Sequence, residues 1–436
     1  MVKLRWLQVN KFRSVKPGTL LTFNDGHNVL LGQNGTGKTT LLNLVAATIK
    51  SNFADFKNEV FDVSYALDSE MAMATVSVRN EHQALPLPTA LESLSPGVLG
   101  YGALPSEGGL RSPVLSVTAS VSNKQTGLRL EIEINGERGT IRRTDGTTPG
   151  PSFGLSRTTA KNLPPWMLLL SGLGEWGNKN PPLLENATAL FDLFLEVTTA
   201  RFDESLEYFN NLGELQLRVT RHPNEDITLF GSLDPRGTTY EQLGSLGHKT
   251  WGADRYVLSA TDLPFLKQTI QLLDFESAEA IIELKESGQE DGADFMQLGN
   301  LRFYFSHRGG WKISEKALSY GQKRMLAFMY YLTTVKSTII ADELVNGLHH
   351  RWIRACFETL GQRQVFLTSQ NPLLLDYLNF QSPEDVRSTF VLCTWEKSPE
   401  QMVWENMTQE AAEDFFASYK VGFQQVGELL QSKGLW

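Results

Sequence analysis

The residues best suited to chemistry form a glycine-rich run near the start of the chain. Residues 32–39 read GQNGTGKT, the pattern G-x-x-x-x-G-K followed by Ser or Thr. Glycines let the backbone curl so that successive N–H groups point at phosphate oxygens, and a following helix adds its positive N-terminal end. The pattern predicts a site for ATP and Mg²⁺, in which Lys38 reaches the β- and γ-phosphates as a catalytic group and Thr39 holds the metal. The residues expected at the nucleotide are Asn34, Gly35, Thr36, Gly37, Lys38, Thr39 and Thr40.

An apolar run that ends in two acids is the second chemical feature. Residues 338–341 (TIIA) read as a strand buried on both faces, and Asp342 and Glu343 follow directly. Ligands of open α/β sheets bind at the C-terminal ends of the strands, which is where these acids would emerge. We therefore expect Asp342 beside Mg²⁺, together with Thr39, and Glu343 as the general base that polarises the attacking water.

A third feature, residues 318–324 (LSYGQKR), precedes an expected helix over residues 325–334. Ser319 is suited to cap that helix and to offer its hydroxyl, with the helix N-terminus, to an anion. The segment resembles the LSGGQ signature of ABC ATPases, with Tyr320 in place of the first glycine. In that family the signature of one protomer caps the γ-phosphate held by another. The resemblance thus implies that Ser319, Gly321 and Gln322 contact ATP.

Two further segments carry the same resemblance. Residues 346–349 (NGLH) are similar to the D-loop of RecF-like and OLD-like ATPases, and an expected strand over residues 364–368 leads into residues 369–372 (SQNP). At the latter position the family has Thr-His-Ser-Pro, whose histidine senses the γ-phosphate. Gln370 stands in its place as the implied catalytic sensor. Glutamine can donate a hydrogen bond but cannot shuttle a proton, so slow hydrolysis is expected.

Near the N-terminus, residues 11–14 (KFRS) resemble the Asn-Phe-Arg-Ser segment that opens many such ATPases. In those proteins the arginine lies near the nucleotide. Two interpretations of Arg13 stay open: a contact with ATP, or a surface charge.

The elements that position these residues make up an α/β fold. We expect an ABC-ATPase head with a P-loop α/β core, an antiparallel β lobe and a helical insertion. Its parts are residues 1–56 (first part of the core), 57–160 (β-rich lobe), 161–290 (mainly helical insertion) and 291–436 (second part of the core). Apolar residues at helical spacing from Phe191 to Phe209 suggest the insertion's helix, residues 286–294 suggest a solvated acidic loop, and a helix through Phe415 and Val426 closes the chain.

The wide separation of Lys38 and Ser319 carries a further resemblance. It resembles SMC, RecF and OLD-like heads, in which an insertion splits the two halves, and it disfavours a transporter ATPase. The chain after Pro372 is too short for the nuclease domain of full OLD proteins. A defence role, as in AAA-family phage-defence ATPases, would therefore require a separate effector protein, a nuclease or toxin.

Composition limits the partners. The net charge of −9 modestly favours a protein partner over duplex DNA, which demands clustered Lys and Arg. No apolar run suits a membrane span, and the two cysteines suggest neither a disulfide framework nor a zinc site. We expect a cytoplasmic ATPase that forms a homodimer or higher oligomer through ATP-dependent head contacts and regulates an effector in anti-phage defence. The alternative is a RecF/SMC-like ATPase that binds DNA in repair or maintenance.

Overall fold

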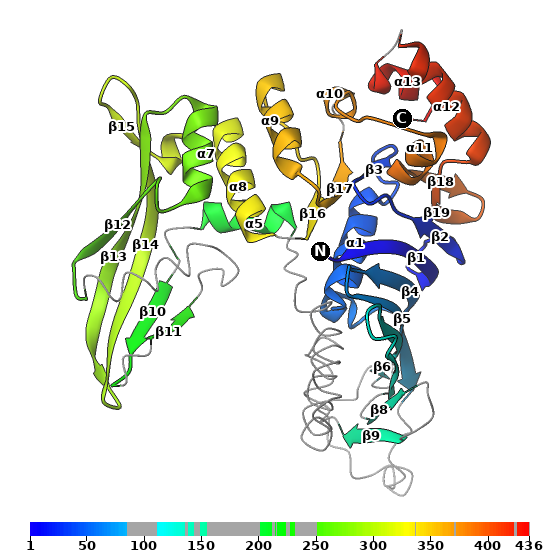
Figure 1. The fold of residues 1–436 in the computed structure, drawn as a ribbon, viewed down its shortest axis with the longest axis horizontal. Coiled ribbons are helices and arrows are strands. Elements are labelled where there is room, and N and C mark those ends of the chain that lie inside the picture. Colours follow the sequence, from blue (N-terminus) through cyan, green and yellow to red (C-terminus); the bar gives the residue numbers. More distant parts are fainter. Residues whose placement is uncertain are drawn as a thin grey trace, which may run out of the picture.

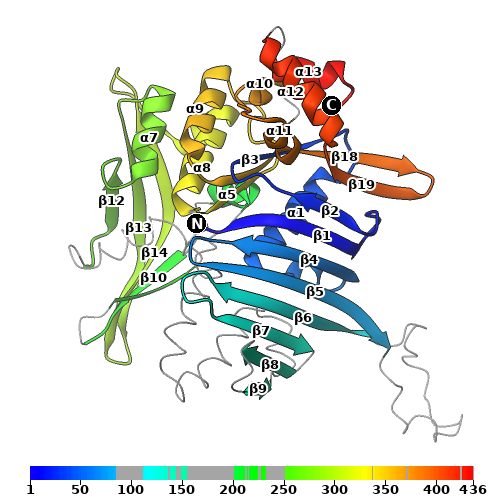
Figure 2. The same cartoon turned by 45° about the vertical axis from the view of Figure 1, so that its right-hand side comes forward.

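The computed structural model describes residues 1–84, 111–135, 138–143, 149–154, 201–211, 214, 216–223, 227–231, 251–335, 337–369, 372–422 and 425–435. Three sheets and the helices that cover them organise these residues (Figure 1). In both overall views the sheet that contains β12–β15 lies at the opposite end of the molecule from the hairpin β18–β19 (Figures 1 and 2). In the described part of the chain, no helix is long and apolar enough to cross a membrane.

The central sheet is built from both ends of the chain. Its strand order is β16-β17-β3-β18-β19, with β16, β17, β3 and β18 parallel and β19 antiparallel to β18. The strands are β3 (His27–Leu31), β16 (Thr338–Ala341), β17 (Gln364–Thr368), β18 (Phe390–Lys397) and β19 (Glu400–Asn406). Every residue of β16 and β17 is buried, as expected for parallel strands covered on both faces. The expected α/β core, divided between the two ends of the chain, is confirmed.

Successive residues of the central strands enter two different cores, because side chains alternate across a strand. Ile339 and Val365 join the core that contains the helices α8 and α9, whereas Ile340 and Phe366 join the core that contains α1 and the β lobe. The helices are α1 (Lys38–Lys50), α5 (Phe202–Asn210), α7 (Pro264–Leu273), α8 (Tyr320–Thr334), α9 (His350–Leu360), α10 (Pro372–Leu375), α11 (Pro383–Thr389), α12 (Gln409–Val421) and α13 (Val426–Ser432), with short 3₁₀ turns at Ala54–Phe56 and Glu315–Ala317.

The second sheet is an antiparallel β lobe with the strand order β2-β1-β4-β5-β6-β7-β8-β9. Its strands are β1 (Lys3–Phe12), β2 (Thr19–Thr22), β4 (Phe61–Asp68), β5 (Ala72–Ala84), β6 (Arg111–Asn123), β7 (Arg129–Asn135), β8 (Arg138–Arg143) and β9 (Pro149–Gly154). Buried and exposed residues alternate along β7, so one face of the lobe meets the core. The N-terminal strands β1 and β2 belong to this sheet, beside the expected lobe.

The third sheet takes up part of residues 161–290, the expected mainly helical insertion. Its strands, in the order β11-β10-β14-β13-β12 with β15 beside β14, are β10 (Gln216–Arg221), β11 (Ile227–Gly231), β12 (Arg255–Ser259), β13 (Ser277–Glu290), β14 (Ala293–Ser306) and β15 (Lys312–Ser314). Within the described part of 161–290, strands therefore predominate over the helices α5 and α7. The apolar spacing that suggested a helix holds in α5, where Phe202 and Leu206 contact the core, while Phe191 lies outside the described residues.

Two local predictions are wrong for identifiable reasons. The acidic run 286–294 is the end of a hairpin, because β13 continues to Glu290 and β14 begins at Ala293. Asp291 and Gly292 form the turn at φ 51° and 77°, and an Asp-Gly pair favours such a turn. The single C-terminal helix is instead two helices, because Gly422 ends α12 in the left-handed conformation.

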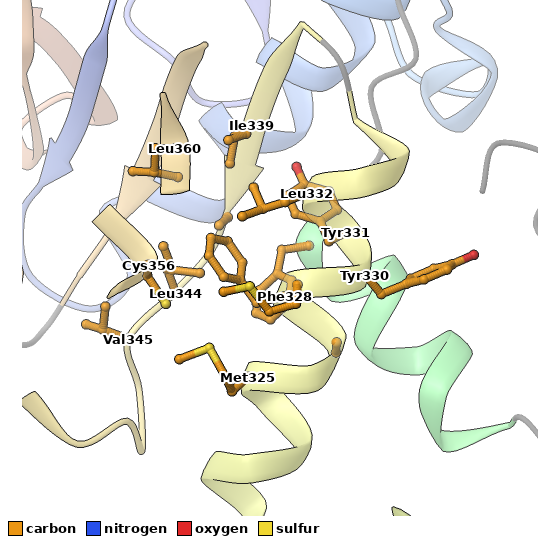
Figure 3. Close-up of a cluster of buried hydrophobic side chains, with 14 of the residues drawn as sticks. Met325, Phe328, Tyr330, Tyr331, Leu332, Ile339, Leu344, Val345, Cys356 and Leu360 are labelled. Atoms are coloured by element: carbon orange, nitrogen blue, oxygen red, sulfur yellow. The ribbon is translucent and has the colours of Figure 1, made fainter. Parts of the chain in front are cut away.

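Helix α8 is fixed to the edge strand of the central sheet. Met325, Phe328 and Leu332 lie in a buried cluster with Ile339 and other side chains of the same core (Figure 3). The hydroxyl of Tyr331 accepts a hydrogen bond from the Ile340 N–H (2.8 Å) and donates one to the Ile340 carbonyl (3.3 Å). A side chain of α8 therefore satisfies both backbone groups of one residue of β16.

Removing this hydroxyl should destabilise the protein. Tyr331→Phe leaves the buried N–H of Ile340 without that acceptor, which should lower the free energy of unfolding by about 1–3 kcal/mol. Tyr419→Phe, which removes an exposed hydrogen bond to Asn379, should cost less than about 0.5 kcal/mol. Urea unfolding followed by circular dichroism measures both. Equal losses in the two variants would show that Tyr331 does not fix β16.

Candidate active site

The glycine-rich loop lies between β3 and α1, packed against the hairpin β18–β19. Gly32 and Gly37 have φ values of 147° and 88°, which a residue with a side chain rarely adopts. A Cβ atom at Gly32 would collide with the carbonyl oxygen of Cys393, and one at Gly37 would collide with the sulfur of Met402. The two glycines are therefore required both by the curl of the backbone and by its close approach to neighbouring strands.

The amine of Lys38 is folded back over this loop. Its Nζ donates hydrogen bonds to the carbonyl oxygens of Gly32 (2.7 Å) and Gln33 (2.9 Å). The Thr36 hydroxyl also donates to Gln33 (2.8 Å), and the indole N–H of Trp404 donates to the Thr36 carbonyl (3.2 Å). Lys38 thus lies along the inside of the curl, where an anion held by the loop would meet its charge.

The other expected loop residues lie around this curl. Asn34 and Gly35 are exposed at its tip, and Thr39 and Thr40 belong to the first turn of α1. The N-terminal end of α1 therefore faces the same space as the loop. Such an end attracts an anion, since its first N–H groups have no partner within the helix.

The acidic strand end meets this turn of α1. The Thr39 hydroxyl donates to Asp342 Oδ2 at 2.6 Å, although the two residues are 303 positions apart in the chain. The hydroxyl of Thr368, at the end of β17, donates to the other oxygen of Asp342 and accepts the backbone N–H of Glu343 at 2.8 Å. Thr368 was not predicted as a site residue. Its place at the C-terminal end of a strand beside β16 could have indicated it.

Glu343 adopts a left-handed backbone conformation, with φ 48°. Such a conformation is uncommon for a residue other than glycine, and it persists only where the surroundings hold it. The carboxylate accepts a hydrogen bond from Asn346 Nδ2 at 3.0 Å. Asn346 was noted only as part of the D-loop segment, and the structure places it on the predicted general base.

The signature segment forms the N-terminus of α8. Ser319 is the N-cap: its hydroxyl accepts the Gln322 N–H (3.3 Å), and the Gln322 side chain accepts the Ser319 N–H (2.9 Å). The predicted capping role of Ser319 is confirmed. Gly321 packs against the D-loop, since a Cβ atom there would lie 2.8 Å from the Gly347 carbonyl oxygen, and the ring of Tyr320 covers Gly347.

Arg13 forms an ion pair in the β lobe. Its Nε and Nη2 each donate to the Glu59 carboxylate at 2.7 Å, and its guanidinium lies 5.1 Å from the ring centroid of Phe12. The hydrogen bond from Arg13 lowers the pKa of Glu59. Gln370, the other residue expected at the phosphate, lies outside the described residues.

The donor set fits a magnesium-bound nucleotide. Across the described ranges, no group of three or more His, Cys, Asp or Glu side chains could hold a metal ion alone. Mg²⁺ commonly uses one or two carboxylates and completes its ligands with waters and substrate phosphates. Thr39 and Asp342, already joined beside the phosphate-binding loop, match this pattern.

Comparisons with known proteins agree with this site. One family model, described as an AAA domain, matches residues 7–138, and another, described as "AAA domain, putative AbiEii toxin, Type IV TA system", matches residues 191–376. No curated protein matches the chain.

Several solved structures are similar to the chain. The SMC head domain from Thermotoga maritima aligns at 12% identity over 93% of this chain and 99% of that chain, with a TM-score of 0.37. The Smc head domain from Pyrococcus furiosus, bound to the C-terminal domain of ScpA, aligns at 11% identity over 96% of this chain and 100% of that chain, with a TM-score of 0.37. The recombination mediator protein RecF-ATPrS in the RecFOR pathway aligns at 12% identity over 93% and 98%, with a TM-score of 0.32.

The two AAA-domain models match the two parts of the chain that carry the site: residues 7–138 contain the glycine-rich loop, and residues 191–376 contain the acidic strand end. The chain is therefore similar to AAA-domain proteins, with its motifs divided between its two ends and a signature-like segment at the start of α8.

The packing of the loop can be tested separately from its chemistry. Gly37→Ala should destabilise the nucleotide-free protein more than Gly35→Ala. Both residues have a positive φ (88° and 87°), but a Cβ atom meets Met402 only at position 37. The strain at either position costs roughly 1–3 kcal/mol, and the collision adds to it at Gly37. Thermal unfolding without nucleotide measures the difference. Equal melting temperatures would contradict the close packing of the loop on β19.

Proposed function

We propose that the protein hydrolyses ATP held between two copies of the chain, and that it thereby regulates a separate effector protein. The observation that carries the ATPase part is the hydrogen-bonded set at the strand ends. Thr39 and Thr368 both bind Asp342, and Thr368 also holds the backbone of Glu343. This set supports the proposal, because the carboxylates proposed to hold Mg²⁺ and to act as general base lie beside the glycine-rich loop.

Each side chain of the set has a definite task. Lys38 exchanges the carbonyl oxygens of Gly32 and Gln33 for phosphate oxygens when the nucleotide binds. Thr39 and Asp342 hold Mg²⁺, which supplies positive charge against the phosphates. Glu343 accepts a proton from the attacking water, so that ATP and water yield ADP and phosphate. Gln370 donates a hydrogen bond to the γ-phosphate and cannot relay a proton, so we expect slow turnover.

The two-copy arrangement is supported by the exposed cap of α8. The Ser319 oxygen accepts a hydrogen bond within the helix, which leaves its own O–H to donate to an anion. The N-terminus of α8 carries partial positive charge. In the assembly, Ser319, Gly321 and Gln322 of one copy contact the phosphates held by Lys38 and Thr39 of the other. For Arg13, two roles remain in this proposal: a nucleotide contact after release from Glu59, or a structural ion pair.

The use of a separate effector is supported by one family description and by charge, and the role in anti-phage defence rests on the resemblance to OLD-like ATPases. The model that matches residues 191–376 covers domains described as putative AbiEii toxin of a Type IV TA system. The net charge of −9 disfavours duplex DNA as the main partner. In this proposal the protein acts in the cytoplasm, and its nucleotide state determines whether a nuclease or toxin is held or released. The second candidate is a RecF/SMC-like ATPase that binds DNA, and the wide separation of the loop and the signature segment, which resembles that of RecF and SMC heads, supports it.

The general base can be separated from nucleotide binding. Glu343→Gln keeps the shape of the side chain but cannot accept a proton, so kcat should fall on the order of 10²- to 10⁴-fold while ATP affinity is kept. An ATP-bound oligomer should then accumulate, measured by light scattering after size exclusion. Lys38→Ala should instead lose nucleotide binding and stay dissociated.

Glu358→Gln is the matched control, because Glu358 pairs with Arg354 on the exposed surface of α9. It should leave turnover and assembly as they are. Undiminished turnover in Glu343→Gln would remove Glu343 from the mechanism, and undiminished ATP affinity in Lys38→Ala would refute the loop assignment.

The partner can be identified from the native gene neighbourhood. We expect the tagged protein to co-purify with a stoichiometric second protein, whose retention changes between ATP and no nucleotide. Mass spectrometry of the intact complex measures both. A protein that purifies alone and shifts a labelled DNA duplex only with ATP would support the DNA-binding alternative instead.

A further inference from the structure

Arg324 lies on the second turn of α8, and its guanidinium is buried. All of the observed hydrogen-bond partners of this guanidinium are uncharged. The residue is 5% exposed. Its Nη2 donates to the carbonyl oxygens of Asp342 (3.2 Å) and Glu343, and its Nε donates to that of Leu344 (3.0 Å). The guanidinium also lies 5.0 Å from the ring centroid of Phe202. One side chain thus binds three consecutive carbonyl groups. They belong to residues 342–344, which we call the catalytic turn because they include the proposed general base.

These hydrogen bonds act on the strained residue. A guanidinium presents its donors in a rigid fork, so it can fix the direction of several carbonyl groups at once, which a lysine ammonium cannot do. The peptide groups on both sides of Glu343 are therefore oriented from α8, while Thr368 holds its N–H from β17. The left-handed φ of 48° at Glu343 is consistent with a turn that is held from both sides.

The same end of α8 carries the signature residues. The Oη of Tyr320 accepts a hydrogen bond from Arg324 Nη1 at 3.4 Å, and the ring of Tyr320 covers Gly347 of the D-loop. Gly321 packs against the Gly347 carbonyl. The first turns of α8 and residues 342–347 therefore form one packed unit, in which a shift of the signature end displaces the backbone that carries Glu343.

We propose that Arg324 is a positioning residue that couples the signature end of α8 to the catalytic turn of its own chain. When the signature end of α8 docks on a second copy, Arg324 sets the carboxylate of Glu343 for the nucleotide bound in its own loop. The coupling rests on the proposed two-copy function, whereas the positioning of Glu343 within one chain does not.

The positioning role is tested first in the full chain with a single substitution. Arg324→Met should lower kcat on the order of 10- to 100-fold, because a small misplacement of the general base is costly, while the KM for ATP changes by less than about twofold. Arg324→Lys, which keeps the charge but not the fork, should have an intermediate kcat. If circular dichroism shows that Arg324→Met does not fold, the kcat of Arg324→Lys is the test.

Arg363→Met is the matched control. Arg363 also donates to backbone carbonyls, those of Leu332 (3.2 Å) and Thr359 (3.3 Å), but at the other end of α8. It should lower the melting temperature without lowering kcat. An equal fall of kcat in Arg363→Met, or no fall in either variant of Arg324, would overturn the positioning role.

The coupling is tested by mixing two inactive variants. Lys38→Ala keeps a signature but no functional loop, and Ser319→Ala keeps a loop but no signature hydroxyl. Their mixture contains pairs with one complete site, in the loop of the Ser319→Ala chain, so ATPase activity should exceed that of either variant alone. Adding Arg324→Met to the Ser319→Ala chain should abolish this gain, while adding it to the Lys38→Ala chain should reduce it much less.

The outcomes separate the positioning of Glu343 within one chain from the coupling to a second copy. Arg324→Met could instead abolish the gain in activity only when it is placed in the Lys38→Ala chain. Arg324 would then shape the signature for the partner chain, and the proposal would be overturned. If mixing produces no gain, the two-copy site and the coupling built on it are both wrong. The kcat of Arg324→Met then still decides whether Arg324 positions Glu343 within its own chain.

Discussion

The parallel pairing of β3 with β17 and β18 is the interaction on which the whole site depends. Val29 lies opposite Leu367 on one side and Phe390 on the other, so a strand from the start of the chain occupies the middle of a sheet from its end. Because β16, β17 and β3 are parallel, their C-terminal ends meet at one edge. The phosphate loop and Asp342 follow those ends, and Thr368 is the last residue of β17. The 2.6 Å bond from Thr39 to Asp342 exists only because this pairing closes the sheet.

The two halves of the site are held in different ways. The loop is held by steric fit, since Gly32 and Gly37 leave no room for a side chain against Cys393 and Met402. The catalytic turn is held by hydrogen bonds from three directions: Thr368 on the N–H of Glu343, Asn346 on its carboxylate, and α8 on the carbonyls. A loop that is held by steric fit keeps its backbone conformation, so it can bind a phosphate without rearrangement of that backbone. A turn fixed by hydrogen bonds from a neighbouring helix changes when that helix moves, which suits the residue proposed as the general base.

Features set by short stretches of sequence could be predicted, and features set by distant contacts could not. The loop, the buried strand before Asp342 and the cap at Ser319 each depend on fewer than ten consecutive residues, and each is where the pattern indicated. A strand end could indicate Thr368 as a site residue, but its hydrogen bond to Asp342 depends on the pairing of β17 with β16. The role proposed for Arg324 depends on which segments become neighbours, and an arginine in a helix does not indicate this by itself. The acidic run 286–294 differs for another reason. The Asp291-Gly292 pair is typical of a hairpin turn, but the charged, exposed residues around it suit a solvated loop equally well, and the pairing of β13 with β14 depends on contacts between two long strands.

The departure of the signature from LSGGQ has a structural reason in the same chain. Tyr320 is 60% exposed, and its ring turns away from the helix onto Gly347, whose φ of 75° and missing side chain make room for it. The next residue has no such freedom, because a Cβ atom at Gly321 would meet the Gly347 carbonyl oxygen at 2.8 Å. Position 320 therefore tolerates a large side chain while position 321 does not. The ring also covers the D-loop and accepts a hydrogen bond from Arg324. In this chain the first turn of α8 is therefore shaped by its contact with the D-loop as well as by any phosphate that it caps.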